Sequence, residues 1–437
     1  MCLSVVRFDL DRGLIRGGRV IVIAGVVIID AQIECSRAKP GSNGQRLLIR
    51  SDGLILLIQA VEERKAARNV SSQEVARRKK AGEDATDLIA HGRALGEEIS
   101  RLETELAAAE QALDAIVMEV PNMTLPDVPA GDETNNVVIR SWGTPRAPDG
   151  VKPHWDIAAA QGLFDLERGA KVSGSGFVVY RGQGARLVRA LMNFFVDSHV
   201  DEHGYEEIWP PLLVNRATMT GTGQLPKFED DAYKIAGDEL FLIPTAEVPV
   251  TNLYRDEIID AEMLPKAFCA YTPCFRREAG AAGKDTRGIL RMHQFDKVEL
   301  VRYCAPGESE AQLQLLLGHA EAMLQQLEIP YRVTLLAAGD TGFSSAKTYD
   351  LEAWAPGVGA WLEVSSVSTF ADFQARRANI RYRPAKGEKP RFVHTLNGSG
   401  LAFPRTMACL LEHHQQADGS VVVPEALRRY VGTNRIG

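Results

Sequence analysis

The stretch LIAHGRALGEEISRLETELAAAEQALDAI, residues 88–116, carries an apolar residue at every third or fourth position along most of its length. After a first step of seven residues the spacing alternates between four and three, and Glu and Arg fill many of the positions between. This heptad pattern is typical of a helix that packs a narrow apolar seam against a partner helix. The seam residues are Leu88, Leu95, Ile99, Leu102, Leu106, Ala109, Leu113 and Ile116.

A second helical stretch with a weaker stripe precedes the seam, over residues 54–80, with Leu57, Val61 and Val75 on the stripe. Only the tight turn at residues 82–84 separates the two stretches, so the two helices are expected to run antiparallel. We therefore predict a helical hairpin that projects as an arm. The alternative is a helix pair inside a larger bundle, but the charged faces leave little apolar surface for a third layer.

Downstream of the hairpin, Pro121, Pro126 and Pro129 predict a linker, and a region that mixes short β-rich runs with helices follows. This region contains no G-x-G-x-x-G after a strand and no Walker lysine motif, which argues against Rossmann and P-loop nucleotide sites. The expected strands are Phe177–Tyr180, Phe241–Ile243, Val298–Val301, Tyr331–Leu335 and Trp361–Val364, and the expected helices are Ala185–Val200 and Glu308–Leu327.

The composition of the 437 residues, 45% hydrophobic and 24% charged, fits an ordinary globular protein of two or three domains. Fifty basic residues against 57 acidic ones give a formal charge of −7, so a nucleic-acid partner would require a local basic cluster. Six scattered cysteines form no C-x-x-C pair, which suits the reducing cytosol. The apolar run at residues 20–29 is too short to span a bilayer and begins too late for a secretory signal. We expect a cytoplasmic protein.

Residues 274–299 form the first stretch with chemical potential. Arg276 and Glu278, two apart on a presumed strand, would point to the same face. An arginine fork can bind a phosphate, and a nearby glutamate can accept a hydrogen bond from an amine. The glycine-rich loop at residues 279–288 could fold over a ligand. The structural alternative is a surface ion pair on a hairpin, and the spacing alone favours that alternative.

Three further stretches carry similar signals. Glu363-Val364-Ser365-Ser366 offers hard oxygen ligands for Mg²⁺, although a strand-end turn would look the same. The glycine-rich residues 396–402 precede Arg405, which could meet a phosphate at the start of a helix over residues 406–415; a common strand-to-helix turn is the alternative. Thr245-Ala246-Glu247 would suit a small ligand carrying an amine, or form a simple capping pair.

Together these stretches resemble class II aminoacyl-tRNA synthetases, and specifically the seryl-tRNA synthetase family. Pro210-Pro211, which follow Gly204-Tyr205-Glu206, are similar to the family's first signature, a helix and strand that end in proline at a dimer interface. Residues 275–278 are similar to the second signature and residues 398–405 to the third. Phrases specific to the seryl family occur at residues 221–228, 293–297 and 373–377, and the resemblance runs from roughly Val61 to the C-terminus.

The resemblance implies an α+β protein: an N-terminal antiparallel helical hairpin, or coiled-coil arm, and a class II catalytic domain built on a mixed, mainly antiparallel sheet flanked by helices. Residues 1–53 would be a segment without family resemblance, residues 54–120 the tRNA-binding arm and residues 121–437 the catalytic domain. The implied enzyme is a homodimer that activates L-serine with ATP and Mg²⁺ and charges serine tRNA, with selenocysteine tRNA as a further candidate. No membrane or DNA partner is expected.

Two other functions stay open at this stage: a paralogue that charges a carrier protein or a natural product, and a non-catalytic tRNA-binding paralogue. The arm argues against the first, and the retained arginines and glutamates argue against the second. Within residues 1–53, the sequence predicts a strand at Val20–Ile23 and a loop at Pro40–Gly44. Because this segment does not resemble the family, one hypothesis is a misassigned start or a reading-frame change upstream. Peptides from residues 1–50 in the native protein would contradict that hypothesis.

The family's functional residues carry over onto matching positions of this chain. Arg276, Glu278 and Arg405 are the implied catalytic residues: Arg276 for the α-phosphate and the serine carboxylate, Glu278 for the adenine side and Arg405 for the γ-phosphate. Phe295 should stack on adenine, and Glu363 and Ser366 should bind Mg²⁺. The implied serine site is Thr245, Ala246, Glu247, Glu299, Asn397 and Ser399. The implied ATP site is Arg276, Arg277, Glu278, Met292, Phe295, Glu363, Val364, Ser365, Ser366 and Arg405.

Some positions depart from the family pattern. Gly176 stands where arginine is frequent, and Val367 and Thr369 replace a cysteine and an asparagine. Phe403-Pro404 replace a Val-Gly pair before Arg405. Because proline is well tolerated at the start of a helix, we expect Arg405 to keep its place. Thr369 and Pro404 are expected near the ATP site, where they could affect activity.

Overall fold

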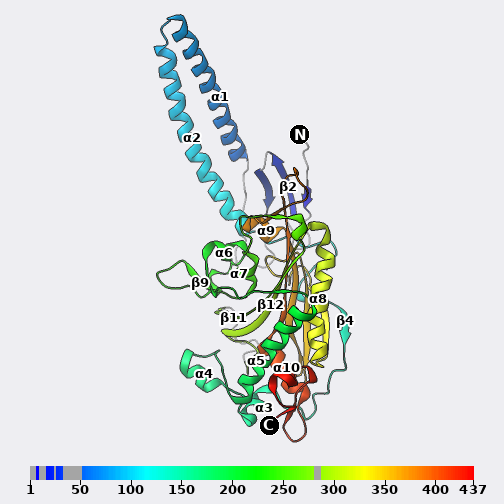
Figure 1. Cartoon of the computed structure of the whole chain (residues 1–437). Coiled ribbons are helices and arrows are strands. Elements are labelled where there is room, and N and C mark those ends of the chain that lie inside the picture. Colours follow the sequence, from blue (N-terminus) through cyan, green and yellow to red (C-terminus); the bar gives the residue numbers. More distant parts are fainter. Residues whose placement is uncertain (1–5, 9–15, 24–25, 33–51, 280–286) are drawn as a thin grey trace. The chain divides into compact units, whose positions relative to one another are not determined.

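The computed structural model describes residues 6–8, 16–23, 26–32, 52–279 and 287–437. The chain divides into two compact units, residues 1–120 and residues 121–437 (Figure 1). The first unit holds two long helices and a small antiparallel sheet in the order β1-β2-β3. These strands are β1 (Val6–Phe8), β2 (Arg16–Ile23) and β3 (Val26–Gln32). The strand expected at Val20–Ile23 lies within β2, whereas the loop expected at Pro40–Gly44 lies outside the described residues.

The two long helices, α1 (Asp52–Ala81) and α2 (Thr86–Met118), form the predicted antiparallel hairpin. The middle of the heptad seam is buried, with Leu95 7%, Ile99 3% and Leu102 8% exposed. Seam residues nearer the two ends are half-buried. Salt bridges between the helices flank the seam, from Arg64 to Glu98 at 3.0 Å and from Lys65 to Glu103 at 2.7 Å. A narrow apolar contact with charged flanks is therefore enough to pair these helices.

The turn of the hairpin has a local chemical cause. Gly82 adopts a left-handed φ of +73°, which ends α1 at no steric cost. The Asp84 carboxylate then accepts hydrogen bonds from the backbone N–H and the hydroxyl of Thr86, at 3.0 and 2.6 Å. These contacts satisfy a free N–H at the start of α2.

The second unit is built on an eight-stranded sheet in the order β4-β13-β14-β15-β18-β12-β11-β7. Every neighbouring pair is antiparallel except β11 and β7, which are parallel, so the prediction of a mixed, mainly antiparallel sheet is confirmed. The strands are β4 (Val137–Trp142), β7 (Glu206–Glu207), β11 (Lys266–Phe275), β12 (Gln294–Cys304), β13 (Tyr331–Leu335), β14 (Lys347–Ala355), β15 (Ala360–Ala371) and β18 (His394–Ala402).

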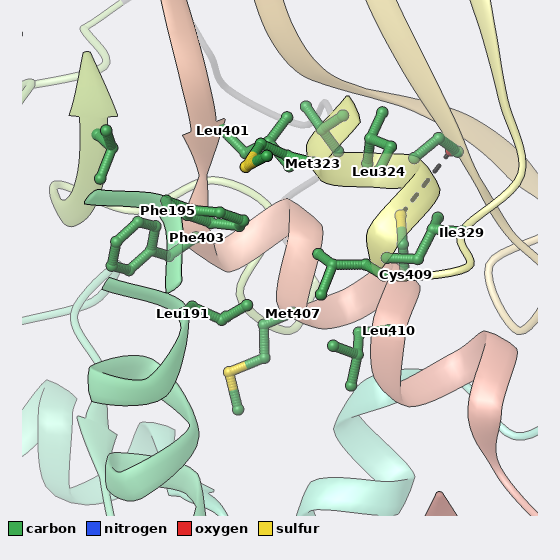
Figure 2. Close-up of a cluster of buried hydrophobic side chains, with 14 of the residues drawn as sticks. Leu191, Phe195, Met323, Leu324, Ile329, Leu401, Phe403, Met407, Cys409 and Leu410 are labelled. Carbon is green, nitrogen blue, oxygen red and sulfur yellow. Dashed lines mark hydrogen bonds between the residues drawn. The ribbon is translucent and has the colours of Figure 1, made fainter. Parts of the chain in front are cut away.

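Three amphipathic helices, α5 (Gly182–Asp197), α8 (Ser309–Gln326) and α10 (Phe403–His414), pack on one face of this sheet. Figure 2 shows Phe403, Met407 and Leu410 of α10 in the cluster that also contains labelled side chains of α5 and α8. The ring of Phe403 lies 5.6 Å from that of Phe195 in α5, centroid to centroid. The largest apolar cluster of the described residues thus fixes the base of α10, which carries Arg405.

The other face of the sheet is covered only in part. Along β12, Val298 and Leu300 join the helix-covered core, whereas Lys297 and Glu299 point to the opposite face, as the period of two in a strand requires. Further along the same face, Val301 and Tyr303 pack under α7 (Glu247–Thr251), α9 (Phe373–Ala378) and a small sheet. The polar residues between these covered regions line cavities.

The remaining helices and strands connect the elements of the large sheet and its covering helices. The predicted helix Ala185–Val200 is α5 as far as Asp197 and continues as a π-helical turn, Ser198–Glu202. Among the described residues, no helix is long and apolar enough to cross a membrane. The other helices are α3 (His154–Gln161), α4 (Leu166–Ser173), α6 (Arg216–Gly221) and α11 (Glu425–Val431), and the other strands are β5 (Phe164–Asp165), β6 (Val179–Tyr180), β8 (Leu213–Asn215), β9 (Leu240–Leu242), β10 (Ile258–Asp260), β16 (Arg381–Arg383), β17 (Arg391–Phe392), β19 (Val421–Val422) and β20 (Arg435–Ile436).

Candidate active site

Two adjoining cavities lie on the partly covered face of the large sheet. The larger has a volume of about 900 Å³ and the smaller about 210 Å³. The larger is lined by Glu278, Met292, Phe295, Val364 and Arg405 among others, and the smaller by Glu247, Glu299, Ser366 and Asn397 among others. Both are lined by Gln224, Thr245, Arg276, Lys297, Glu363 and Ser399. Most of the residues implied by the resemblance are therefore brought to one place from five separate stretches of the chain.

Arg276 lies where the two cavities meet. Its backbone N–H donates to the carbonyl of His293 at 2.9 Å, and its Nε donates to the carbonyl of Pro244 at 3.3 Å. Its guanidinium stands over the Phe295 ring, 5.1 Å from the centroid. These contacts fix a cation between a ring in the larger cavity and the carboxylates of the smaller one.

The sequence prediction that Arg276 and Glu278 share one face of a strand is wrong. Strand β11 ends at Phe275, and Glu278 adopts a left-handed φ of +52° beyond it. Glu278 instead reaches the larger cavity through this bend and pairs with Arg291, on the returning side of the loop. The backbone turn, and not strand alternation, therefore brings the two side chains to the same cavity; residues 280–286 of the loop lie outside the described residues.

Arg405 and Glu363 meet across the larger cavity. Arg405 Nη1 donates to the backbone oxygen of Glu363 at 2.8 Å and to its Oε2 at 3.3 Å, and Nε donates to the carbonyl of Leu290 at 3.2 Å. The helix expected to start at Thr406 starts at Phe403, so Arg405 lies inside the first turn of α10 and keeps its place as expected. Glu363 lies within β15, so its stretch is not a strand-end turn.

A network of carboxylates and amides lines the smaller cavity. The Asn397 amide donates to Glu247 Oε2 at 2.8 Å and to Glu299 Oε1 at 2.9 Å. Lys297 forms an ion pair with the other side of the Glu299 carboxylate. Because Asn397, Glu299 and Lys297 lie on the neighbouring strands β18 and β12, the sheet itself sets the spacing of these groups. A buried site of this kind can bind an ammonium group and a hydroxyl group together.

Burial changes the acidity of Glu247 more than any single contact does. The loss of solvent, and then the neighbouring Glu299 carboxylate, raise the pKa of Glu247 to about 7. Hydrogen bonding to Gln374 and the charges of Lys297 and Arg276 oppose this rise. The carboxylate is therefore poised between its charged and neutral forms near neutral pH.

A set of oxygen atoms surrounds Ser366. In the ladder between β14 and β15, Ser366 lies directly opposite Asp350, and Glu363 follows on the same face after a bulge. Burial, together with the Glu363 carboxylate, raises the pKa of Asp350 well above its usual range. Its buried Oδ1 has no hydrogen-bond partner within the described residues. Two carboxylates and a hydroxyl, one atom of them unsatisfied, are the hard ligands that Mg²⁺ takes.

Three residues of the implied site lie elsewhere. Ala246 is fully buried in the apolar cluster beneath α7. Arg277 turns toward a neighbouring loop, where Nη1 donates to the Asp230 carbonyl at 3.2 Å. Ser365 points to the opposite side of β15 from Ser366 and donates to the backbone oxygen of Ser399 at 2.6 Å. None of the three lines either cavity, so any part they play in the site runs through the backbone or through neighbours.

The departures from the family pattern fall in different surroundings. Pro404 lines the larger cavity as expected, but Thr369 lines neither cavity and is buried. A Cβ added at Gly176, where φ is +80°, would stand 2.4 Å from the ring of His293. The small residue at position 176 is therefore matched to the place that His293 takes in this chain.

Gln224, Lys297, Asp350 and Gln374 are among the residues that the structure brings to the site and that sequence reasoning did not assign to it. Lys297 could have been found, because it lies two residues before Glu299 and shares its face of a strand. Gln374 lies in α9, within the family segment at residues 373–377, and Asp350 lies in β14; only their contacts show that these two side chains belong to the site. Gln374 is fully buried and donates to Glu247 Oε1 at 2.6 Å.

Comparison with known proteins identifies this architecture. Residues 227–414 match the model of the tRNA synthetase class II core domain (G, H, P, S and T). The fold is thus that of a class II aminoacyl-tRNA synthetase. Residues 45–124 match the seryl-tRNA synthetase N-terminal domain, so this likeness starts earlier than the expected boundary near Val61.

Individual relatives agree with these matches. A serine–tRNA ligase from Gemmatimonas aurantiaca is 69% identical over 86% of this chain and 88% of its own length. The crystal structure of seryl-tRNA synthetase from Pyrococcus horikoshii complexed with ATP is 39% identical, covers 88% of this chain and 91% of its own, and superposes with a TM-score of 0.84. A cytoplasmic serine–tRNA ligase from Naegleria fowleri in complex with AMP is 30% identical, covers 88% of this chain and 90% of its own, and has a TM-score of 0.79. The chain belongs to the seryl-tRNA synthetase family.

Proposed function

We infer that this protein is an ATP-dependent serine–tRNA ligase. The serine carboxylate attacks the α-phosphate of ATP, which gives seryl-adenylate and releases pyrophosphate. A hydroxyl of the 3′-terminal ribose of serine tRNA then attacks the carbonyl carbon of the adenylate, which forms the ester and releases AMP. The observation that carries the inference is the position of Arg276, between a large cavity with further arginines and a small cavity lined by carboxylates.

The larger cavity suits a nucleoside triphosphate. Arg276 is placed to hold the α-phosphate and the attacking carboxylate together. Arg405 is placed to neutralise the γ-phosphate end of the triphosphate. Phe295 offers an aromatic face for the base, and Glu278, held by Arg291, offers a carboxylate on the base side. Catalysis in such a site consists of positioning and charge neutralisation, and no covalent enzyme intermediate is required.

The smaller cavity suits the amine and hydroxyl of serine. Glu247, with Thr245 beside it, is placed to accept hydrogen bonds from the ammonium group, and Glu299 with Ser399 to satisfy the side-chain hydroxyl. Alanine lacks the hydroxyl and would leave the buried Glu299 carboxylate without this partner. A site of this kind rejects the analogue that lacks the group.

Mg²⁺ is proposed to bind at Glu363 and Ser366, with Asp350 beside them as a third oxygen source. When bound there, the ion would supply positive charge to the triphosphate. The chain's own residues hold the ligand oxygens in place: β15 presents Glu363 and Ser366 on one face, and Arg405 fixes the Glu363 carboxylate from α10.

The hairpin is proposed to bind serine tRNA. The candidate contact residues are the basic cluster at residues 77–80. Two members of the cluster are already committed within the hairpin, because Arg77 pairs with Glu74 at 2.7 Å and Arg78 with Asp87 at 3.1 Å. Lys79 and Lys80 are exposed and form no salt bridge with the described residues. These two lysines are therefore better placed to contact RNA phosphates.

A symmetric homodimer is also proposed. Strand β7 is the last strand of the large sheet, and Trp209, two residues beyond it, is 73% exposed. An exposed tryptophan at a sheet edge is typical of an interface with another chain. Light scattering at micromolar concentration should give the mass of two chains, and the mass of one chain would contradict the dimer.

Because tRNA charging serves translation, the proposal places the enzyme in the cytoplasm.

The decisive experiment for the enzymatic function is ATP–pyrophosphate exchange dependent on L-serine. We expect exchange with serine and little exchange with alanine or threonine at the same concentration. Charging of serine tRNA, compared with loading of a carrier protein, then separates the ligase from a carrier-protein paralogue. Absence of serine-dependent exchange in folded protein would contradict the proposed function.

A further inference from the structure

Gln374 occupies a buried position behind the carboxylate of Glu247. Its side-chain nitrogen donates to Glu247 Oε1 at 2.6 Å and lies 3.5 Å from the carbonyl of Thr222. Its side-chain oxygen accepts a hydrogen bond from the Thr395 hydroxyl at 2.7 Å. Gln374 and Thr395 are both 0% exposed. The amide therefore lies between the proposed ammonium site and a hydroxyl on β18.

The two contacts fix which way the amide faces. An ionised carboxylate only accepts hydrogen bonds, so the nitrogen of Gln374 has to face Glu247. The oxygen of the amide must then face Thr395, whose hydroxyl is able to donate. A buried polar group with defined partners on both sides has little freedom to turn, because each alternative orientation leaves a group unsatisfied.

We propose that Gln374 is a positioning residue for substrate binding, which orients the Glu247 carboxylate and favours the form that accepts the ammonium group of serine. The proposal rests on the proposed serine site and adds to it a residue that does not itself contact the substrate. It also assigns Thr395 a part, because this hydroxyl holds the amide in the orientation that Glu247 requires.

The surroundings of Glu247 explain why such help is required. From β12, the Glu299 carboxylate opposes the charge of Glu247 and Lys297 supports it; Arg276 supports it from beyond β11. Asn397 donates to the second carboxylate oxygen from β18. Burial raises the pKa of Glu247 to about 7, and the hydrogen bond from Gln374 acts in the opposite direction. Without that hydrogen bond, the charged form would be favoured only at higher pH.

The test compares wild-type protein with Gln374→Leu by serine-dependent pyrophosphate exchange, with KM measured for serine and for ATP. We expect the serine KM to rise about tenfold or more, as for a lost hydrogen bond to a charged group, with the ATP KM nearly unchanged. We also expect the acid limb of kcat/KM for serine to move to higher pH. A loss of packing alone would not move that limb in a protein of normal thermal stability.

Gln415→Leu is the matched control. This glutamine is also buried, and its amide donates to the Lys152 and Glu412 carbonyls at 2.8 and 3.2 Å, away from both cavities. Its serine KM and its acid limb should equal those of the wild type. If both leucine variants raise the serine and ATP KM values together, a general disturbance of the fold is the cause and the proposal is overturned.

Two further variants keep the test decisive if Gln374→Leu does not fold. Thr395→Val frees the amide to turn and should raise the serine KM in the same direction by a smaller factor. Gln374→Glu places a second acid against Glu247 and removes the donor, and it should weaken serine binding at neutral pH. Serine KM values within twofold of the wild type in every folded variant would overturn the role of Gln374. A wild-type protein without serine-dependent exchange would instead overturn the proposed function.

Discussion

The arm and the catalytic unit bury their apolar residues in different ways. In the arm, a line of residues such as Leu95, Ile99 and Leu102 packs along one seam, and charged residues pair across the flanks. In the catalytic unit, helices cover one face of the central strands of the sheet, and the opposite face combines packed residues with cavities that are lined in part by polar side chains. The arm is thus built from local contacts between two helices, whereas the catalytic site depends on strands that are distant in the sequence. The two regions should therefore respond differently to the same kind of change.

Deletion of the arm is expected to have the largest effect on tRNA charging. Removing residues 61–116 and joining the ends with a short linker should abolish charging of serine tRNA. Serine-dependent pyrophosphate exchange should remain, because every residue proposed for the two cavities lies at or beyond Met219. Both activities are measured on the same purified variant, with circular dichroism to verify folding.

Two results would contradict the proposed division of function between the arm and the catalytic unit. Intact tRNA charging in the deletion variant would show that the arm is not the tRNA grip. Loss of adenylate formation in a folded variant would show that the catalytic site requires the arm.

Glu299→Ala tests the hydroxyl pocket. We expect kcat/KM for serine in pyrophosphate exchange to fall roughly a hundredfold, because a buried charge-assisted hydrogen bond is lost. This factor corresponds to a loss of about 3 kcal/mol of transition-state stabilisation. The variant also leaves Lys297 without its carboxylate partner, so Glu299→Ala combined with Lys297→Met is the required control. Recovery of serine use in the double variant would show that the unpaired charge of Lys297, and not the missing partner for the serine hydroxyl, caused the loss.

The pKa of Glu247 predicts a pH dependence. Burial and the neighbouring Glu299 raise this pKa to about 7, and the ammonium of serine requires the ionised carboxylate. As pH falls below about 7, the carboxylate is protonated, and kcat/KM for serine should fall by about tenfold per pH unit. Glu247→Gln should lower serine use at neutral pH and remove this limb; a limb that persists unchanged would contradict the assignment.

The smallest expected effect belongs to the basic cluster of the arm. Replacing Lys79 and Lys80 with glutamine should lower the slope of log K against log salt for tRNA binding by about one unit per lost phosphate contact. Arg77→Gln is the comparison, because Arg77 already pairs with Glu74 and should change the slope less. A larger change in slope for Arg77→Gln than for either lysine would reverse this ranking. Serine-dependent pyrophosphate exchange should be equal in all these variants.

The accuracy of sequence prediction differed between the two regions for a physical reason. The heptad seam predicted the buried residues of α2, because each position in a helix pair follows from local spacing. The turn at residues 82–84 was also predicted, because a glycine followed by two acidic residues between two helical stretches is a local signal; the structure adds the left-handed φ of Gly82 and the Asp84–Thr86 hydrogen bonds. In the catalytic unit, the strand Tyr331–Leu335 was predicted with its observed bounds, but strand order could not be derived from spacing.

The site was predicted through family resemblance more than through local chemistry. Strand alternation wrongly placed Arg276 and Glu278 on one face, because a chain bend at Glu278 follows the end of β11. Ser365 and Ser366 are adjacent in the sequence, but alternation along β15 sends them to opposite faces. Most other implied residues line a cavity as described above, while their individual roles stay predictions.

The sequence by itself determined the helical hairpin, the presence of a β-rich unit after the prolines and the residue types available for an ATP and serine site. These features depend on local periodicity, turn chemistry and motif. Tertiary structure alone decided that Gln374 and Asn397 contact Glu247, that Thr395 contacts Gln374, and that Asp350 faces Ser366. It also decided the pKa of Glu247 in α7, because a value near 7 requires burial and a second carboxylate, that of Glu299 on β12. Burial and charge proximity are properties of the folded arrangement, and no stretch of the sequence contains them on its own.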